Sequence, residues 1–239
     1  MRLLNWRNKR EQPTSEPLVV PNRTGTAALT LPGEVVDSIR YIYTRVGQKD
    51  RIPPCLSVIA ALRGEGVTTV SQALAATMAH DLRARVCLID LNWWWPSNSP
   101  LTDPENPGLA AVFAGDAHLA DVIVRTGWRN LYCLPAGQMP REDRPVVAHS
   151  RYLKGMLDEL NQQFDFLILD IPAILATSDA VSLASLGAAC CLVIRQGVTR
   201  VEDVHLALDE ASQLTMLGVV LNQFKLETPK QILRFMPAR

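Results

Sequence analysis

The sequence has no excess charge of either sign, no C-x-x-C pair and no apolar run long enough to cross a bilayer. Lys plus Arg and Asp plus Glu number 24 each, so no net field draws the chain toward nucleic acid. The most apolar segment, residues 181–194, is too short for a membrane span, and residues 1–10 lack the apolar core of a signal peptide. These absences favour a cytoplasmic protein that does not bind nucleic acid.

Cysteine and histidine are too scattered to predict a disulfide framework or a metal site of their own. The five cysteines are an odd number and lie in or beside apolar runs, and none of the four histidines has metal-ligand spacing. We therefore expect reduced thiols in the core. The length of 239 residues and the 48% hydrophobic content suit one globular domain.

Composition divides the chain into three parts. Residues 1–33 contain four prolines among polar residues, which predicts a flexible or extended arm without regular secondary structure. Its first ten residues mix apolar and basic side chains, typical of a loose terminus or of a membrane-surface contact. Residues 34–224 carry the periodic segments of a domain, and residues 225–239 form a tail without tyrosine.

The periodic region alternates between strand and helix patterns. Predicted strands cover 56–61, 86–90, 131–134, 166–171, 189–195 and 217–222. Predicted helices cover 34–46, 68–82, 110–114, 119–124, 147–161, 180–186 and 201–213. Unbroken apolar strands are typical of buried parallel sheets, so we expect a doubly wound, mostly parallel α/β sheet. Ligands bind such sheets at the carboxyl ends of the strands.

A glycine loop follows the first of these strands and opens a helix. It is laid out like the phosphate loop G-x-x-x-x-G-K-[ST], with Ala61 and Gly66 at the two small positions. In such loops, backbone N–H groups surround the phosphates while the lysine reaches the β and γ oxygens. Here Thr68 would offer its hydroxyl to magnesium, but Val67 takes the place of the lysine. The loop is predicted to keep its shape without its cation.

Two further strands end in an acid at the same predicted edge. Asp90 ends the strand 86–90 and Asp170 lies near the end of 166–171, where a Walker B acid would lie. One aspartate after an apolar strand is weak support, since it is often a helix cap or a turn residue. The loop and two such acids in order indicate a magnesium-nucleotide site.

These motifs resemble the cytoplasmic kinase domain of bacterial tyrosine kinases of exopolysaccharide synthesis, of the CpsD/CapB/Wzc type, which are relatives of the MinD/ParA ATPases. The family's loop looks like P-G-E-G-K-[ST]-T, matched by Gly64-Glu65-Gly66 and Thr68-Thr69. Its motifs L-I-D-x-D-x-R-x-P and D-x-x-I-x-D-x-P-P are similar to residues 88–96 and 165–173. The resemblance runs from about residue 34 to residue 224 and implies a three-layer P-loop NTPase fold.

The resemblance also implies ATP or ADP and Mg²⁺ as cofactors and gives each motif residue a role. The catalytic acids would be Asp90 and Asp170, with Thr68, Asp90 and Asp170 around magnesium. The nucleotide-binding residues would be Gly64, Glu65, Gly66, Thr68, Thr69 and Asn222. Asn222 matches a family position near the adenine base, although an asparagine that ends a strand is also an ordinary turn residue.

The departures from the family pattern concern activity. Val67 replaces the lysine, Asn92 replaces the second acid of the middle motif, and Trp94 replaces its arginine. Phosphoryl transfer depends on positioning and electrostatics, and losing one preorganised donor costs about 10²–10³ in rate in other enzymes. We therefore expect a degenerate regulatory or scaffold protein with weak or lost ATP binding. The alternative is an active kinase or ATPase in which Arg63 or Arg195 substitutes for the lysine, unless both are solvated surface residues.

Three consecutive tryptophans, Trp93, Trp94 and Trp95, follow the middle strand. Successive residues of an extended segment point to opposite sides, so the three rings cannot share one core face. At least one ring is expected at an interface or over the nucleotide cleft, and our hypothesis is that Trp94 makes an apolar contact surface. The alternative is that two rings pack under the following loop.

The family's first helix carries an E-x-x-R-x-x-R pattern that is used in ring assembly. This chain has Glu34, Asp37 and Arg40 at those positions, so the first arginine is an acid. We expect a hetero-oligomer with an intact homologous kinase rather than a self-assembled ring, or simply a solvated helix face. The family is held at the inner membrane face by a transmembrane polysaccharide co-polymerase that activates it. That partner would here be a separate chain, with this protein cytoplasmic and peripheral to the membrane.

Overall fold

A computed structural model describes residues 15–49, 52–96, 99–103 and 105–223. The strands are β1 (Leu18–Pro21), β2 (Ala27–Leu31), β3 (Cys55–Ala60), β4 (Val86–Asp90), β5 (Val124–Arg125), β6 (Leu131–Leu134), β7 (Phe166–Asp170), β8 (Ala189–Arg195) and β9 (Met216–Asn222). The helices are α1 (Gly33–Lys49), α2 (Val67–Leu82), α3 (Gly108–Ala114), α4 (Leu119–Val122), α5 (Asp143–Ala148), α6 (Arg151–Gln163), α7 (Ala180–Ala184) and α8 (Val201–Glu210).

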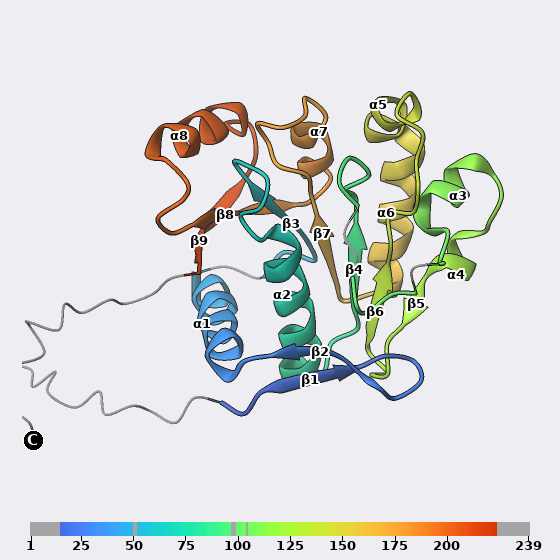
Figure 1. The fold of residues 1–239 in the computed structure, drawn as a ribbon, viewed down its shortest axis with the longest axis horizontal. Coiled ribbons are helices and arrows are strands. Elements are labelled where there is room, and N and C mark those ends of the chain that lie inside the picture. The colour runs from blue at the N-terminus through green and yellow to red at the C-terminus, as the bar shows by residue number, and fades with distance from the viewer. Residues whose placement is uncertain (1–14, 50–51, 97–98, 104, 224–239) are drawn as a thin grey trace, which may run out of the picture.

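The centre of the fold is a seven-stranded sheet in the order β5-β6-β4-β7-β3-β8-β9. Neighbouring strands are parallel except for β5, which pairs with β6 in the antiparallel direction. Helices cover both faces of the sheet (Figure 1). The predicted doubly wound, mostly parallel α/β sheet is therefore confirmed, and β3, β4 and β7 end at one edge.

Side chains of the central strands alternate between two cores. Ile59, Ile89 and Leu169 point into the core that is closed by α3, α5, α6, α7 and α8. Their strand neighbours Val58 and Leu88 point into the opposite core, under α1 and α2. This alternation follows from the pleat of a strand whose two faces are both buried. The result is the expected three-layer fold, in which the sheet lies between two layers of helices.

An antiparallel hairpin of β1 and β2 precedes the sheet, so the prediction of an arm without secondary structure is wrong for residues 18–31. The side chains of Val20 and Leu31 are buried in the core under α2, whereas Val19, the neighbour of Val20 in β1, is 44% exposed. The prolines do not prevent pairing, because Pro21 stands at the end of β1, where the register shifts. Residues 1–14 and 225–239, for which an arm and a tail were predicted, lie outside the described residues.

The predicted helix over 147–161 is divided into two, which corrects that assignment. α5 ends at Ala148 and α6 begins at Arg151. Ser150 between them has extended backbone, and its side chain accepts a hydrogen bond from Leu153 N, 3.1 Å away. This is an N-cap, which satisfies one of the free N–H groups at the start of α6. The helix predicted over 119–124 likewise ends at Val122, because Val124 pairs with Cys133 in β5 and β6.

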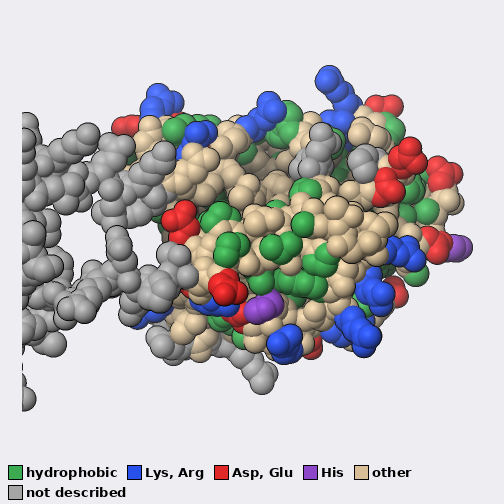
Figure 2. Space-filling model, turned by 60° about the horizontal axis from the view of Figure 1, so that its bottom comes forward, with side chains coloured by type: hydrophobic (Ala, Val, Ile, Leu, Met, Phe, Trp, Pro, Cys, Tyr) green, Lys and Arg blue, Asp and Glu red, His purple; other side chains and the backbone are tan. Residues whose placement is uncertain are grey.

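Figure 2 views the molecule from the side of the hairpin, which lies below α2 in Figure 1. Hydrophobic side chains gather in the middle of this face, with charged groups around them (Figure 2). The exposed hydrophobic residues of β1 and α2 include Val19 and Leu82. None of the described helices has both the length and the hydrophobicity that a membrane span requires.

Candidate functional site

The glycine loop lies between β3 and α2, at the edge where the central strands end. Gly64 and Gly66 have backbone φ angles of 81° and 97°, in the left-handed region that glycine tolerates. A Cβ atom at Gly66 would lie 2.1 Å from the Nδ2 atom of Asn222. The second glycine is therefore required by backbone conformation and by a close neighbour, and α2 begins immediately after it at Val67.

Glu65 connects this loop to the segment after β8 and to the end of β9. Its side chain is 2% exposed, and its carboxylate accepts hydrogen bonds from Leu62 N, at 3.0 Å, and from the Thr199 hydroxyl. The Asn222 amide donates to the Glu65 carbonyl oxygen at 2.8 Å. Asn222 thus holds the loop backbone, and the loop is fixed by the segment after β8 and by the end of β9. A place for Asn222 near an adenine base stays a prediction.

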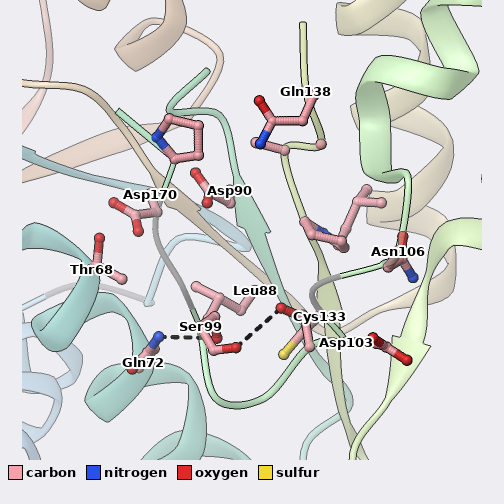
Figure 3. A pocket seen from close by; sticks show the side chains of 16 residues that line it. Thr68, Gln72, Leu88, Asp90, Ser99, Asp103, Asn106, Cys133, Gln138 and Asp170 are labelled. Carbon is pink, nitrogen blue, oxygen red and sulfur yellow. Dashed lines mark hydrogen bonds between the residues drawn. The ribbon is translucent and has the colours of Figure 1, made fainter. Parts of the chain in front are cut away.

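The two acids lie side by side on neighbouring strands. Asp90 of β4 and Asp170 of β7 are opposite each other in the parallel register. Asp170 is 2% exposed, and its Oδ1 atom has no hydrogen-bond partner among the described residues. The Thr68 hydroxyl, from the first turn of α2, hydrogen-bonds the same carboxyl group. Figure 3 shows the three side chains together on one side of a pocket.

Burial raises the pKa of the Asp170 carboxyl well above its ordinary value. The negative charge of Asp90 raises this pKa further, and the hydrogen bond from Thr68 lowers it. A buried carboxyl with a free oxygen, beside a second acid and a hydroxyl, is a set of hard oxygen ligands that suits Mg²⁺. The residues present therefore fit the magnesium half of a nucleotide site.

No group of three or more His, Cys, Asp and Glu side chains in the described part of the chain could hold a metal ion. Asp90, Asp170 and the Thr68 hydroxyl would thus leave much of the octahedral shell of a magnesium ion to other ligands. Magnesium in proteins is commonly held in this way, by one or two carboxylates together with water and phosphate oxygens. These three residues would therefore fit a metal-nucleotide complex better than a bare ion.

A cavity of about 140 Å³ opens beside the three side chains. The rest of its wall, which no motif predicted, is made by Gln72, Ser99, Asp103, Asn106 and Gln138. Figure 3 shows Gln72 below Thr68 on α2, donating to the Ser99 hydroxyl at 3.1 Å, with Asp103, Asn106 and Gln138 on the other side of the pocket. None of the described lining residues is basic. The wall comes from a helix and from loops far apart in sequence, so spacing alone could not assemble it.

Val67 and Asn92 occupy two of the three positions where the family pattern has charged groups and this chain does not. Val67 is partly buried and packs against the core under α1 and α2. Asn92 has a structural role, since its N–H donates to Asp90 Oδ1 at 2.8 Å and its own Oδ1 accepts from Trp95 N at 3.2 Å. Neither residue supplies a charge to the site.

The three tryptophans lie in three different environments. Trp93 is fully buried and its Nε1–H donates to the Ala136 carbonyl oxygen at 2.8 Å. Trp94 packs against Trp93, with 6.3 Å between the ring centroids. Trp95 lies under the guanidinium of Arg63, whose central carbon is 4.1 Å from the ring centroid. The ring beside the glycine loop is therefore Trp95 and not Trp94.

The two candidate cations and the α1 arginine also have defined places. Arg63 is exposed at the start of the loop, while Arg195 ends β8 and donates its main-chain N–H to Thr199 at 2.8 Å. Arg40 of α1 forms two hydrogen bonds with the carboxylate of Asp81 in α2, at 2.7 and 3.0 Å. The structure thus pairs Arg40 within the chain rather than offering it to a partner.

Comparison with known proteins agrees with this geometry, although no family model matches the sequence. Tyrosine-protein kinase CpsD of Streptococcus agalactiae is 27% identical over 197 residues, covering 80% of this chain and 82% of that protein. Tyrosine-protein kinase Etk of Escherichia coli is 28% identical over 170 residues, which are 70% of this chain but 23% of Etk.

Solved structures of the same kinds of protein share the fold. The kinase domain of Escherichia coli Etk superposes with a TM-score of 0.73 at 26% identity, covering 81% of this chain and 77% of that domain. MinD of Pyrococcus horikoshii, complexed with Mg-ADP, gives a TM-score of 0.60 at 27% identity and covers 79% of each chain. The chain is therefore a homologue of the bacterial tyrosine kinases, built on the fold of the MinD-like P-loop ATPases.

Proposed function

We propose that this protein is a degenerate member of the kinase group that serves as a regulatory or scaffold subunit in capsular or exopolysaccharide synthesis and export. The observation that carries the proposal is Val67, which stands where the loop lysine would reach the phosphates and packs against the core. ATP binding or hydrolysis is impaired in consequence, because the charge on the transferred phosphoryl group has no counterpart at that position.

The acidic half of the site is kept. Asp90, Asp170 and the Thr68 hydroxyl would hold magnesium, which when bound neutralises charge on the β and γ phosphates. Asn92 orients the turn after β4 but carries no charge and cannot accept a proton from an attacking hydroxyl. The arrangement supports nucleotide recognition more than it supports transfer.

The alternative function is an active ATP-dependent protein-tyrosine kinase or ATPase that uses a substitute cation. One observation favours it: Arg63 precedes Gly64 directly and is stacked on Trp95, so a positive charge is held next to the loop. Arg195, the other candidate, has no comparable platform among the contacts of the described residues.

The same proposal extends to partners and location. The partners would be a transmembrane polysaccharide co-polymerase that acts as activator at the inner membrane face and an intact homologous kinase in a mixed oligomer. What supports a homologous kinase as partner is that this chain itself resembles proteins named tyrosine-protein kinases. The protein would then be cytoplasmic and peripheral to the membrane.

Turnover of the natural protein and of a Val67→Lys, Asn92→Asp double variant tests the proposal. Phosphate release and phosphotyrosine formation would be measured with magnesium and ATP, beside an intact homologous kinase. We expect turnover at least about 10²-fold below that kinase for the natural protein and a measurable gain for the double variant. Turnover by the natural protein at the rate of the intact kinase would establish the alternative.

A further inference from the structure

Arg63 and Trp95 form a contact that joins the glycine loop to the segment after β4. The guanidinium carbon lies 4.1 Å from the centroid of the indole ring, well within the range of a cation–π interaction. The contact links the residue immediately before Gly64 with a half-buried ring three residues after Asn92. It therefore lies where both motifs of the candidate site meet.

Hydrogen bonds tie the main chain of Trp95 to the end of β4, where Asp90 lies. The main-chain N–H of Trp95 donates to the Asn92 side chain at 3.2 Å, and the Asn92 N–H donates to Asp90 Oδ1 at 2.8 Å. Two residues earlier, the fully buried Trp93 anchors the same segment to the Ala136 carbonyl oxygen. The segment that carries Trp95 is thus tied to the core and to Asp90.

When the face of a guanidinium stacks on an aromatic ring, the N–H groups along its edge can still donate hydrogen bonds to other groups. Among the residues that the structure describes, no carboxylate forms a salt bridge with Arg63. Planar edge donors of this kind recognise phosphate in a bidentate manner. The side chain is held at the loop, exposed, with its hydrogen-bonding capacity unused by described acids.

We propose that Trp95 is a positioning residue that holds Arg63 as the phosphate-binding cation of the loop. The protein then retains affinity for nucleoside polyphosphates even though the lysine is replaced by Val67 and transfer is impaired. This inference rests on the proposed function, since it takes the same loop to be the nucleotide site. The inference gives Trp95 the role of holding Arg63 and gives Asn92 the role of holding the main chain of Trp95. The replacement of charged residues at Val67 and Asn92 does not by itself explain these contacts.

Calorimetric titration of the full chain with Mg-ATP, Mg-ADP and adenosine tests the role of the pair. We expect Arg63→Ala to weaken Mg-ATP binding about tenfold or more and to leave adenosine binding unchanged, because a charged hydrogen-bond donor to phosphate is lost. Trp95→Ala should weaken it about fivefold, whereas Trp95→Phe, which keeps an aromatic face, should stay within about twofold of the natural protein.

Arg45→Ala is the matched control, because Arg45 also stacks on a ring, that of Tyr41, at 5.7 Å on the exposed side of α1. Its affinity should equal that of the natural protein, and melting temperatures would verify that every variant is folded. The inference is overturned if the natural protein binds no Mg-ATP up to millimolar concentration, if Arg63→Ala binds as well as the natural protein, or if Trp95→Phe behaves like Trp95→Ala. These outcomes concern the affinity for Mg-ATP. The proposed function would instead be contradicted by rapid turnover of ATP, so the two failures can be told apart.

Discussion

At the scale of single residues, the candidate site has two acids of the family pattern, Asp90 and Asp170, but has Val67 in place of the lysine. Asp170 remains buried beside Asp90, with one oxygen atom that has no partner among the described residues. Burying such a carboxyl without a ligand costs folding free energy, because the group must either take up a proton or keep its negative charge away from water. A metal ion bound between Asp170 and Asp90 would offset this cost.

Replacing this acid should therefore stabilise the protein in the absence of metal and nucleotide. We expect Asp170→Asn to raise the free energy of unfolding by about 1 kcal/mol in metal-free buffer at neutral pH, because the variant has no carboxyl to desolvate. Chemical denaturation of both proteins measures the difference. A less stable variant would mean that the carboxyl makes a stabilising interaction in solution that the structure lacks.

Asp81 forms a second polar cluster, away from the loop. Its carboxylate accepts from Arg40 and, at 2.8 Å, from the Tyr43 hydroxyl, and His80 Nδ1 lies 2.7 Å from its Oδ1 atom. The Arg40 hydrogen bonds hold the pKa of the Asp81 carboxyl below its ordinary value, against the effect of desolvation. The folded state thus favours the ionised form.

Stability from this cluster should depend on pH in a defined direction. A carboxyl with a lowered folded pKa contributes stability above its unfolded pKa of about 3.9 and loses it as the pH falls through the folded value. We expect Asp81→Asn to cost about 1–2 kcal/mol at pH 7, near the low end because Arg40 is partly exposed, and less as the pH falls below about 4. Urea denaturation from pH 3 to pH 7 measures this difference, and a constant difference would contradict the assignment.

At the scale of elements, the hairpin of β1 and β2 completes the core under α2. Leu31 is 3% exposed there, and the main-chain N–H of Gly127 donates to the Pro21 carbonyl oxygen at 2.8 Å. This short two-stranded sheet is stable because its inner face packs against a helix, which an isolated hairpin cannot do. The hairpin is thus part of the domain.

Truncating the inner face of the hairpin should destabilise the whole domain. We expect Leu31→Ala to cost about 2–4 kcal/mol, since it removes buried methyl groups and leaves a cavity. Val19→Ala is the matched control on the outer face, and it should change stability by less than about 0.5 kcal/mol. Denaturant unfolding of the two variants gives both values. Equal and small effects would mean that the hairpin is detached in solution.

At the scale of the whole molecule, strand order decides which segments meet. The register places Asp170 opposite both Asp90 of β4 and Val58 of β3, so the loop after β3 and the two acids share one edge. The segment after β8 and the end of β9 then fix Glu65 from the other side. The site is therefore built from five strands that are distant in sequence.

The pairing of Arg40 with Asp81 also bears on assembly. Since the arginine is used within the chain, we expect no self-assembled ring, and size-exclusion light scattering should give the 26.4 kDa mass of one chain. Mixing with an intact homologous kinase should give a co-eluting complex if the proposed scaffold role is right. A ring formed by the protein alone, or separate elution from the kinase, would contradict these two expectations respectively.

Local pattern predicted most of the elements, since apolar strands and amphipathic helices leave a periodic signal. It did not predict the hairpin, because the prolines that mark its ends look like those of an unstructured arm. It also did not predict the break at Ser150, where one capping hydrogen bond outweighs the helical pattern on both sides. In both places, local signals had two interpretations and tertiary packing selected one.

The sequence by itself determined the α/β class, the glycine loop, the two acids and the missing lysine, because each depends on residue type and short-range spacing. Only the tertiary structure decided that Trp95, rather than Trp94, lies under Arg63, that Arg40 is paired within the chain, and that the wall facing the acids has no basic residue among its described members. These are contacts between segments far apart in the chain, and packing of the whole sheet, not local spacing, fixes them.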